Sequence, residues 1–126
     1  MNLYSEIENI FPTLESLFSE KDLLKFKNTR IIDLYRYHFG LGTWIRNNLI
    51  YPKDSVLCDL FIENGIEQPD DMSSFIIKLF HYHIWNKIYN IFKICNKKDI
   101  KIIKTTAKTV VLLCYLINLV ISYIYI

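Results

Sequence analysis

Glycine and proline, the residues that most often mark turns, occur only three times each in this chain of 126 residues. An all-β sandwich needs turn residues about every 8–12 positions, and so few glycines and prolines cannot supply them. Apolar residues make up 52% of the chain, which excludes intrinsic disorder because a chain of this composition can bury a core. The length suits one domain of about 100–150 residues. The sequence therefore predicts a small, compact, all-α domain.

The segment over residues 30–49 has the clearest helical period in the chain. Its apolar residues recur every three or four positions and form one stripe, made of Ile31, Leu34, Leu41 and Ile45. The opposite side predicts a surface that faces solvent or a partner, made of Asp33, Arg36, Thr43 and Asn47. Gly40 and Gly42 each cost about 1 kcal/mol relative to alanine inside a helix. They therefore mark a local break or let another backbone approach closely.

Other helices are predicted from start and stop signals along the chain. A first helix opens at Pro12, and residues 19–22 look like a capping box at the start of a second short helix. A helix over 55–64 would end at Gly65, which suits a left-handed C-terminal cap. A long helix over 72–90 carries an apolar arc that we expect to pack against the stripe; its members are Phe75, Ile76, Leu79, Phe80 and His83. The domain would then contain four or five helices.

Charge divides the chain into three parts. Residues 1–86 carry eight Lys/Arg against twelve Asp/Glu, whereas residues 87–108 carry seven lysines against one acid. No charged side chain follows residue 108. We therefore expect a helical domain over residues 1–90 and a lysine-rich juxtamembrane segment over 91–108.

The last eighteen residues, 109–126, form an uncharged and mostly apolar run. As a helix this run would be about 27 Å long, just short of a hydrocarbon core of about 30 Å. The preceding lysines would keep their flank on the cytoplasmic side. These features predict an additional C-terminal transmembrane helix that anchors a cytoplasmic body. The alternative, that 109–126 is the last core element of the domain, stays open. Nucleic acid is not an expected partner, because the basic run lacks arginines and a stacking platform.

Two motifs carry a resemblance to a known family. Residues 38–48 read His-Phe-Gly-Leu-Gly-Thr-Trp-Ile-Arg-Asn-Asn, and residues 69–74 read Pro-Asp-Asp-Met-Ser-Ser. In this order they resemble the HFGLGxWIRNN and PDDxSS segments of a bacterial family of small domains of unknown function. The resemblance covers roughly residues 12–86. It implies a small helical fold and a bacterial origin, and it implies no activity.

His38 and the residues around it are the first candidates for a site. His38 falls within the apolar stripe, so a half-buried imidazole hydrogen-bonded in the core is one interpretation. The other makes His38 a general base, Arg46 an anion clamp, and Asp70 or Asp71 the orienting carboxylate. Asp71 is also explained as a helix N-cap. Both interpretations of His38 stay open from the sequence.

Arg46, Asn47 and Asn48 follow the glycine-containing helix. They either hydrogen-bond the last helical carbonyls and brace the next loop, or recognise a carboxylate or phosphate. His81 and His83 are two residues apart, which on a helix directs them about 200° apart and argues against a shared metal ion.

No cofactor or metal site is expected from the cysteines either. The three are widely spaced and include no CxxC pair: Cys58, Cys95 and Cys114.

Two functional hypotheses follow. The first is a non-enzymatic protein-interaction module, of adaptor or immunity type, that presents the Asp33/Arg36/Thr43/Asn47 face or the Arg46–Tyr51 turn to a protein partner. The alternative is a small enzyme or anion-binding domain using His38, Arg46 and Asp71. Together the candidate binding residues are His38, Arg36, Thr43, Arg46, Asn47, Asn48 and Asp71.

Overall fold

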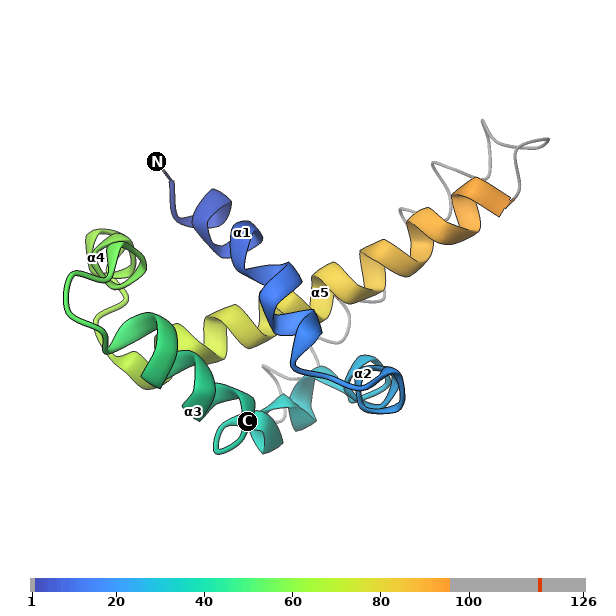
Figure 1. The fold of residues 1–126 in the computed structure, drawn as a ribbon, viewed down its shortest axis with the longest axis horizontal. Helices are drawn as coiled ribbons and strands as arrows, with labels where there is room; N and C mark the ends of the chain where they lie inside the picture. Colours follow the sequence, from blue (N-terminus) through green and yellow to red (C-terminus); the bar gives the residue numbers. More distant parts are fainter. Residues whose placement is uncertain (1, 96–115, 117–126) are drawn as a thin grey trace.

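The computed structural model describes residues 2–95 and residue 116, and the regular structure in that part of the chain is helical (Figure 1). Five α-helices, one 3₁₀-helix and one π-helix follow in the order α1 (Leu3–Ser16), α2 (Glu20–Lys27), η1 (Ile31–Tyr37), α3 (Leu41–Ile45), η2 (Arg46–Ile50), α4 (Val56–Glu63) and α5 (Pro69–Cys95). The predicted all-α class is confirmed for these residues.

The long helix α5 is the element around which the others pack. It contacts α1, α2, η1, α3 and η2, and Figure 1 shows it as a rod that crosses behind α1 and extends beyond α1 and α2 toward its C-terminal end. Met72, Ile76 and Phe80 of α5 are fully buried at the centre of this arrangement. The predicted packing of the long helix against Ile31 and Ile45 is confirmed, because both belong to the same core.

The buried side of α5 is rotated relative to the predicted apolar arc. Ser73, Ile77 and His81, which lie outside that arc, are buried, whereas Phe75 and Leu79 are half-buried. The reason is that α5 is covered from two directions: α1 stacks Phe11 on the His83 side, and α2 meets α5 on the His81 side. A sequence period shows where apolar residues lie, but the neighbouring helices decide how far the buried surface extends.

Several predicted helix boundaries are confirmed by their caps. The Ser19 hydroxyl accepts a hydrogen bond from the Asp22 amide at 3.1 Å, and Ser55 caps α4 in the same way. Gly65 has φ +84°, the left-handed conformation expected after a helix. The predicted first boundary is wrong, because α1 begins at Leu3 and contains Pro12 in its interior.

The proposed N-cap role of Asp71 is also wrong. Helix α5 begins at Pro69, so Asp71 lies within its first turn, and the first helical hydrogen bond runs from the Met72 amide to the Gln68 carbonyl at 3.0 Å. Proline suits this first position because its fixed φ is already helical and its missing N–H has no helical partner to lose. The carboxylate of Asp71 still lies at the positive end of the helix dipole.

The segment over residues 30–49 is not one helix. The 3₁₀-helix η1 ends at Tyr37, and α3 begins at Leu41 after a turn that contains Gly40. The break interpretation of the glycines is therefore confirmed for Gly40. The single face predicted from a continuous helical period does not exist: Asp33 and Arg36 belong to η1, and the other two predicted residues belong to α3 and η2.

Helix α5 passes the predicted domain boundary at residue 90 and continues to Cys95. The remainder of the predicted juxtamembrane segment and the predicted transmembrane helix over 109–126 lie outside the described residues, apart from Leu116. Among the described helices, none combines the length and the apolar character needed to cross a membrane.

Candidate functional site: a buried arginine centre and an adjoining groove

Arg46, the first residue of η2, is buried although it is charged. Only 7% of the residue is exposed. Gly42, four positions earlier, makes room for it: a Cβ added to Gly42 would lie 3.0 Å from Arg46 Nη1 and 3.3 Å from the Tyr37 carbonyl oxygen. The close-approach interpretation of the glycines is therefore confirmed for Gly42.

The Arg46 guanidinium joins three parts of the fold. Its Nη1 donates to Ser73 Oγ of α5 at 2.8 Å, and its Nη2 donates to the His38 carbonyl at 3.0 Å and to Thr43 Oγ1 at 3.1 Å. These bonds tie the turn after η1 to α3 and to the first turns of α5. We call Arg46, His38, Thr43, Asp70 and Ser73 the arginine centre.

Asp70 forms the outer edge of the arginine centre. Its Oδ1 lies 3.5 Å from Arg46 Nε and 4.0 Å from His38 Nε2, and 69% of its side chain is exposed. Of the two candidate carboxylates, Asp70 and Asp71, the structure therefore places Asp70 near His38 and Arg46. Asp71 is exposed, and the described residues contain no hydrogen bond or ion pair between it and the arginine centre.

The contacts of Arg46 indicate what this centre can do. Each of its three guanidinium nitrogens faces an acceptor within the protein, so its charge is neutralised and hydrogen-bonded internally. His38 is half-buried, and its Nδ1 lies 3.5 Å from Arg46 Nη1. The core interpretation of His38 therefore agrees with the structure. The arrangement braces the fold rather than offering donors to a ligand.

Asn47 and Asn48 lie on the exposed side of η2. The Asn48 side-chain amide donates to the Trp44 carbonyl at 2.8 Å, which is the structural role predicted for this residue. The π-helix places the Tyr51 amide on the Arg46 carbonyl at 2.8 Å, five residues earlier. Single π-turns often occur at functional sites, and here the turn accompanies the buried arginine.

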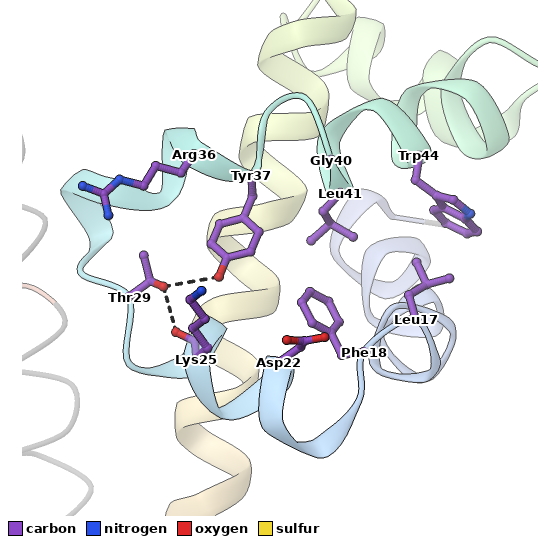
Figure 2. A pocket seen from close by; sticks show the side chains of 10 residues that line it. All are labelled: Leu17, Phe18, Asp22, Lys25, Thr29, Arg36, Tyr37, Gly40, Leu41 and Trp44. Carbon is purple, nitrogen blue, oxygen red and sulfur yellow. Dashed lines mark hydrogen bonds between the residues drawn. The ribbon is translucent and has the colours of Figure 1, made fainter.

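A groove of about 670 Å³ lies between α2, the end of α1 and the η1–α3 connection (Figure 2). Most of its lining is apolar, with charged groups contributed by α2 and η1. The residues that line it are Leu17, Phe18, Asp22, Lys25, Thr29, Arg36, Tyr37, Gly40, Leu41 and Trp44. Arg36 is the only residue of the predicted site that the groove contains. Sequence reasoning missed the rest because they come from segments that only the tertiary fold brings together.

Polar groups of the groove differ in how far they are already paired. The Thr29 hydroxyl lies 3.4 Å from the Tyr37 hydroxyl and donates to the Lys25 carbonyl. Arg36 forms a 3.7 Å ion pair with Asp33, and its pKa is raised by a hydrogen bond with Tyr35 first and by Asp33 second, so it stays charged. The Lys25 ammonium has no ion pair or hydrogen bond to any described residue, and Figure 2 shows it directed toward the ring of Tyr37.

Large side chains project into solvent beside this groove. Tyr35 is 70% exposed and Phe39 is 86% exposed. The 3₁₀ geometry explains the exposure of Tyr35, because positions three apart eclipse in such a helix and Ile31 and Leu34 occupy the buried row. We call Tyr35, Arg36 and Phe39 the η1 ridge.

Helix α2 forms one wall of the groove, and hydrogen bonds from α5 hold its C-terminal end in place. The last carbonyl of α2, that of Lys27, accepts hydrogen bonds from His81 Nε2 at 3.1 Å and Trp85 Nε1 at 3.0 Å. His81 is buried, and desolvation is the first cause of its lowered pKa, which keeps it neutral. The predicted apolar arc contains His83 but not His81, and this is wrong: His81 is the buried histidine, whereas His83 is half-buried, stacks on Phe11 and pairs with Glu15 at 3.4 Å.

A metal site is not found in the described part of the chain. No group of three or more histidine, cysteine or acidic residues there is arranged to hold an ion. His81 and His83 do diverge, as their spacing predicts, since they contact α2 and α1 respectively.

These features define an all-α domain with a buried arginine centre and an open groove beside an aromatic ridge. The chain belongs to the family described as Domain of unknown function (DUF6794), whose model matches residues 5–84. The matched region runs from α1 into α5 and contains the arginine centre, the groove and the η1 ridge. The predicted relation to a family of unknown function is confirmed, while the bacterial origin stays a prediction. No curated protein and no solved structure matches the chain.

Proposed function

We propose that this protein is a non-enzymatic interaction module that binds a protein partner through the η1 ridge and the adjoining groove. The observation that carries the proposal is the exposure of Phe39 and Tyr35, at 86% and 70%, on either side of Arg36 in the chain. Aromatic residues and arginine are the types most enriched at the energetic centres of protein interfaces. Exposed apolar patches often mark sites of protein interaction.

The surroundings of the η1 ridge support the same proposal. The groove of about 670 Å³ includes Arg36 in its lining. A second hollow of about 300 Å³, between η1 and α5, includes Tyr35 and His38 in its lining. Two hollows that share residues with the η1 ridge would allow side chains of a partner to pack against it, as interface cores require.

The proposal changes the residues assigned to the interface. Arg36 keeps its predicted role, and Phe39 and Tyr35 join it. Thr43 and Arg46 are used within the arginine centre, and Asn48 bonds the Trp44 carbonyl. An adaptor and an immunity-type protein would both use such a surface. The alternative of an enzyme or anion-binding domain using His38, Arg46 and Asp71 stays a prediction, with Asp70 rather than Asp71 beside His38 and Arg46.

A membrane tether is part of the proposal on the basis of the sequence. Residues 109–126 carry no charge and follow a lysine-rich run, the pattern of a C-terminal anchor with a cytoplasmic body. The expected result is that the full-length protein pellets with membranes from its native cell and resists carbonate extraction. Recovery in the supernatant without detergent would remove the tether and leave the interaction proposal in place.

The interface is tested by comparative capture from the native cell. We expect the paired substitution Phe39→Ser with Arg36→Glu to remove specific partners that the wild type retains. A matched control, Val56→Ser with Lys53→Glu, changes an exposed apolar side chain and a cation near the start of α4 instead. Equal recovery of every partner by the wild type and the ridge variant, both shown to be folded by circular dichroism, would contradict the proposal.

A further inference from the structure

We propose that the groove takes an acidic segment of the protein partner, with one large apolar side chain seated in the groove and flanking carboxylates over Lys25 and Arg36. This inference rests on the interaction function proposed above and names the chemistry of the partner. It concerns what the groove binds, whereas the capture experiment above tests the η1 ridge.

The first argument is that charge is segregated along the domain. Residues 20–37, which form α2 and η1, carry five Lys/Arg against three Asp/Glu, a balance of +2. The remainder of residues 1–86 carries three against nine, a balance of −6. The groove therefore lies on the basic part of residues 1–86, with Lys25 and Arg36 against Asp22 in its lining. An acidic partner is attracted to this part and repelled from the rest of residues 1–86.

The second argument is that the groove has an apolar interior with a cation above it. Leu41, Phe18 and Trp44 supply apolar surface, and Leu17 at the rim is 44% exposed. In Figure 2 the Lys25 side chain rises from α2 toward Tyr37, across the groove from these residues. A leucine or phenylalanine of the partner would bury its side chain against the apolar surface, and an adjacent carboxylate would meet the ammonium.

Asp22 determines which end of the groove would accept the carboxylates of the partner. It is the one acidic residue among the described residues that line the groove, and it lies in the first turn of α2, whereas Lys25 follows one turn later. Arg36 lines the groove from η1 at the side of Lys25, and Figure 2 shows its guanidinium directed outward, away from Asp22. Carboxylates of the partner would therefore avoid the Asp22 end and lie toward Lys25 and Arg36. Removing the charge of Asp22 should strengthen the binding of an acidic segment.

The test uses fluorescent hexapeptides and the full-length chain in an anisotropy titration. The probe has leucine and phenylalanine at its centre and two acidic residues on each side, with both ends blocked. One control peptide replaces the four acids with lysines, and a second replaces the two apolar residues with serines. We expect the acidic apolar probe to bind at least about tenfold more tightly than either control, and to weaken as salt is raised.

Matched variants assign the binding to the groove. Lys25→Glu should weaken binding of the acidic probe about tenfold. Lys53→Glu, an equal charge reversal in the 51–54 connection, should leave it unchanged, and Asp22→Asn should strengthen it about threefold. A photoreactive phenylalanine in the probe should crosslink to the peptide fragment containing Leu41 and Trp44.

Four results would overturn the inference. The lysine peptide could bind as tightly as the acidic one, or the crosslinks could map outside the groove. A free fatty carboxylate such as laurate could bind more tightly than the probe, which would make the groove a small-molecule site. The chain could also associate with itself in sedimentation and lose this association in the Lys25→Glu variant, which would make a second copy the occupant. Failure of the peptide alone, with ridge-dependent capture intact, rejects this inference and keeps the proposed function.

Discussion

Arg36 and Arg46 lie ten residues apart, on opposite sides of the turn that contains Gly40, and the fold uses them in opposite ways. Arg46 is 7% exposed and donates to Ser73, Thr43 and the His38 carbonyl. Arg36 projects into solvent beside the groove, with the half-buried Asp33 as its ion-pair partner. Both were candidates for binding from the sequence alone.

The difference shows that a charged residue in a distinctive motif can serve the fold or a partner, depending on what surrounds it. Burying an arginine is expensive unless its donors are matched by acceptors. The arginine centre provides those acceptors from three elements, so Arg46 holds the elements together. The η1 ridge provides few, so Arg36 stays available to another molecule.

The largest expected effect comes from removing Arg46. Arg46→Met keeps an apolar side chain in place but leaves the His38 carbonyl and the hydroxyls of Thr43 and Ser73 without their guanidinium donor. We expect a loss of about 3 kcal/mol in the free energy of unfolding, measured by urea denaturation. The matched substitution Arg36→Met should change it by less than about 0.5 kcal/mol. Similar losses for the two variants would erase the distinction between the two regions.

Substituting each of two glycines by alanine compares the packed surroundings of Arg46 with the open turn before α3. Gly42→Ala places a Cβ 3.0 Å from Arg46 Nη1 and 3.3 Å from a backbone carbonyl, so we expect a loss of about 1–2 kcal/mol in spite of the higher helix propensity of alanine. Gly40→Ala meets no atom within 4 Å and has a negative φ, so its effect should stay within about 0.5 kcal/mol. Equal unfolding midpoints for the two variants would show that Gly42 does not make room for Arg46.

His81 adds to the comparison of Arg46 and Arg36 a titratable group that is buried in its neutral form. Its pKa is lowered in the folded protein by desolvation, against about 6.5 in the unfolded chain. As the pH falls below about 6.5, the unfolded chain takes up a proton that folded His81 resists, so this contribution to stability is present above that pH and is lost on acidification.

The measurement for His81 is the free energy of unfolding at pH 7.5, 6.5 and 5.5. We expect His81→Gln, which can still donate to the Lys27 carbonyl, to show a smaller decrease between pH 7.5 and 5.5 than the wild type. An identical pH slope for the two proteins would show that His81 does not titrate differently on folding.

The smallest expected effect on stability comes from the η1 ridge. Phe39→Ser with Arg36→Glu should change the free energy of unfolding by less than about 0.5 kcal/mol, because these side chains contact water more than the core. The same urea titration measures it. A loss above 1 kcal/mol would indicate that the ridge supports the fold, which would also weaken its assignment as an interface.

Local signals in the sequence predicted much of the helical framework. Ser19, Ser55 and Gly65 act at the boundaries their chemistry indicates, because a cap depends on atoms within three or four residues. The start of α1 was missed because Pro12 resembles an opening residue, although α1 begins nine residues earlier at Leu3, after its cap Asn2.

The candidate site was predicted only in part. The sequence placed His38, Arg46 and an aspartate together, and the structure selects Asp70, which is exposed at the edge, over Asp71. Of the η1 ridge, the sequence predicted Arg36, whereas the exposure of Tyr35 follows from a 3₁₀ geometry that a helical period of 3.6 does not describe. The groove was missed because its walls belong to elements separated by up to 27 positions in the chain.

The sequence by itself determined the class of structure, the helix caps and the uneven distribution of charge, since each depends on composition or on residues within one helical turn. The tertiary fold decided that Arg46 is buried while Arg36 is exposed, and that Lys25 and Trp44 share a groove. The physical reason is that burial and electrostatic pairing depend on distances between elements far apart in the chain. These distances are set when the helices pack around α5, and the pattern of residues along the chain does not contain them.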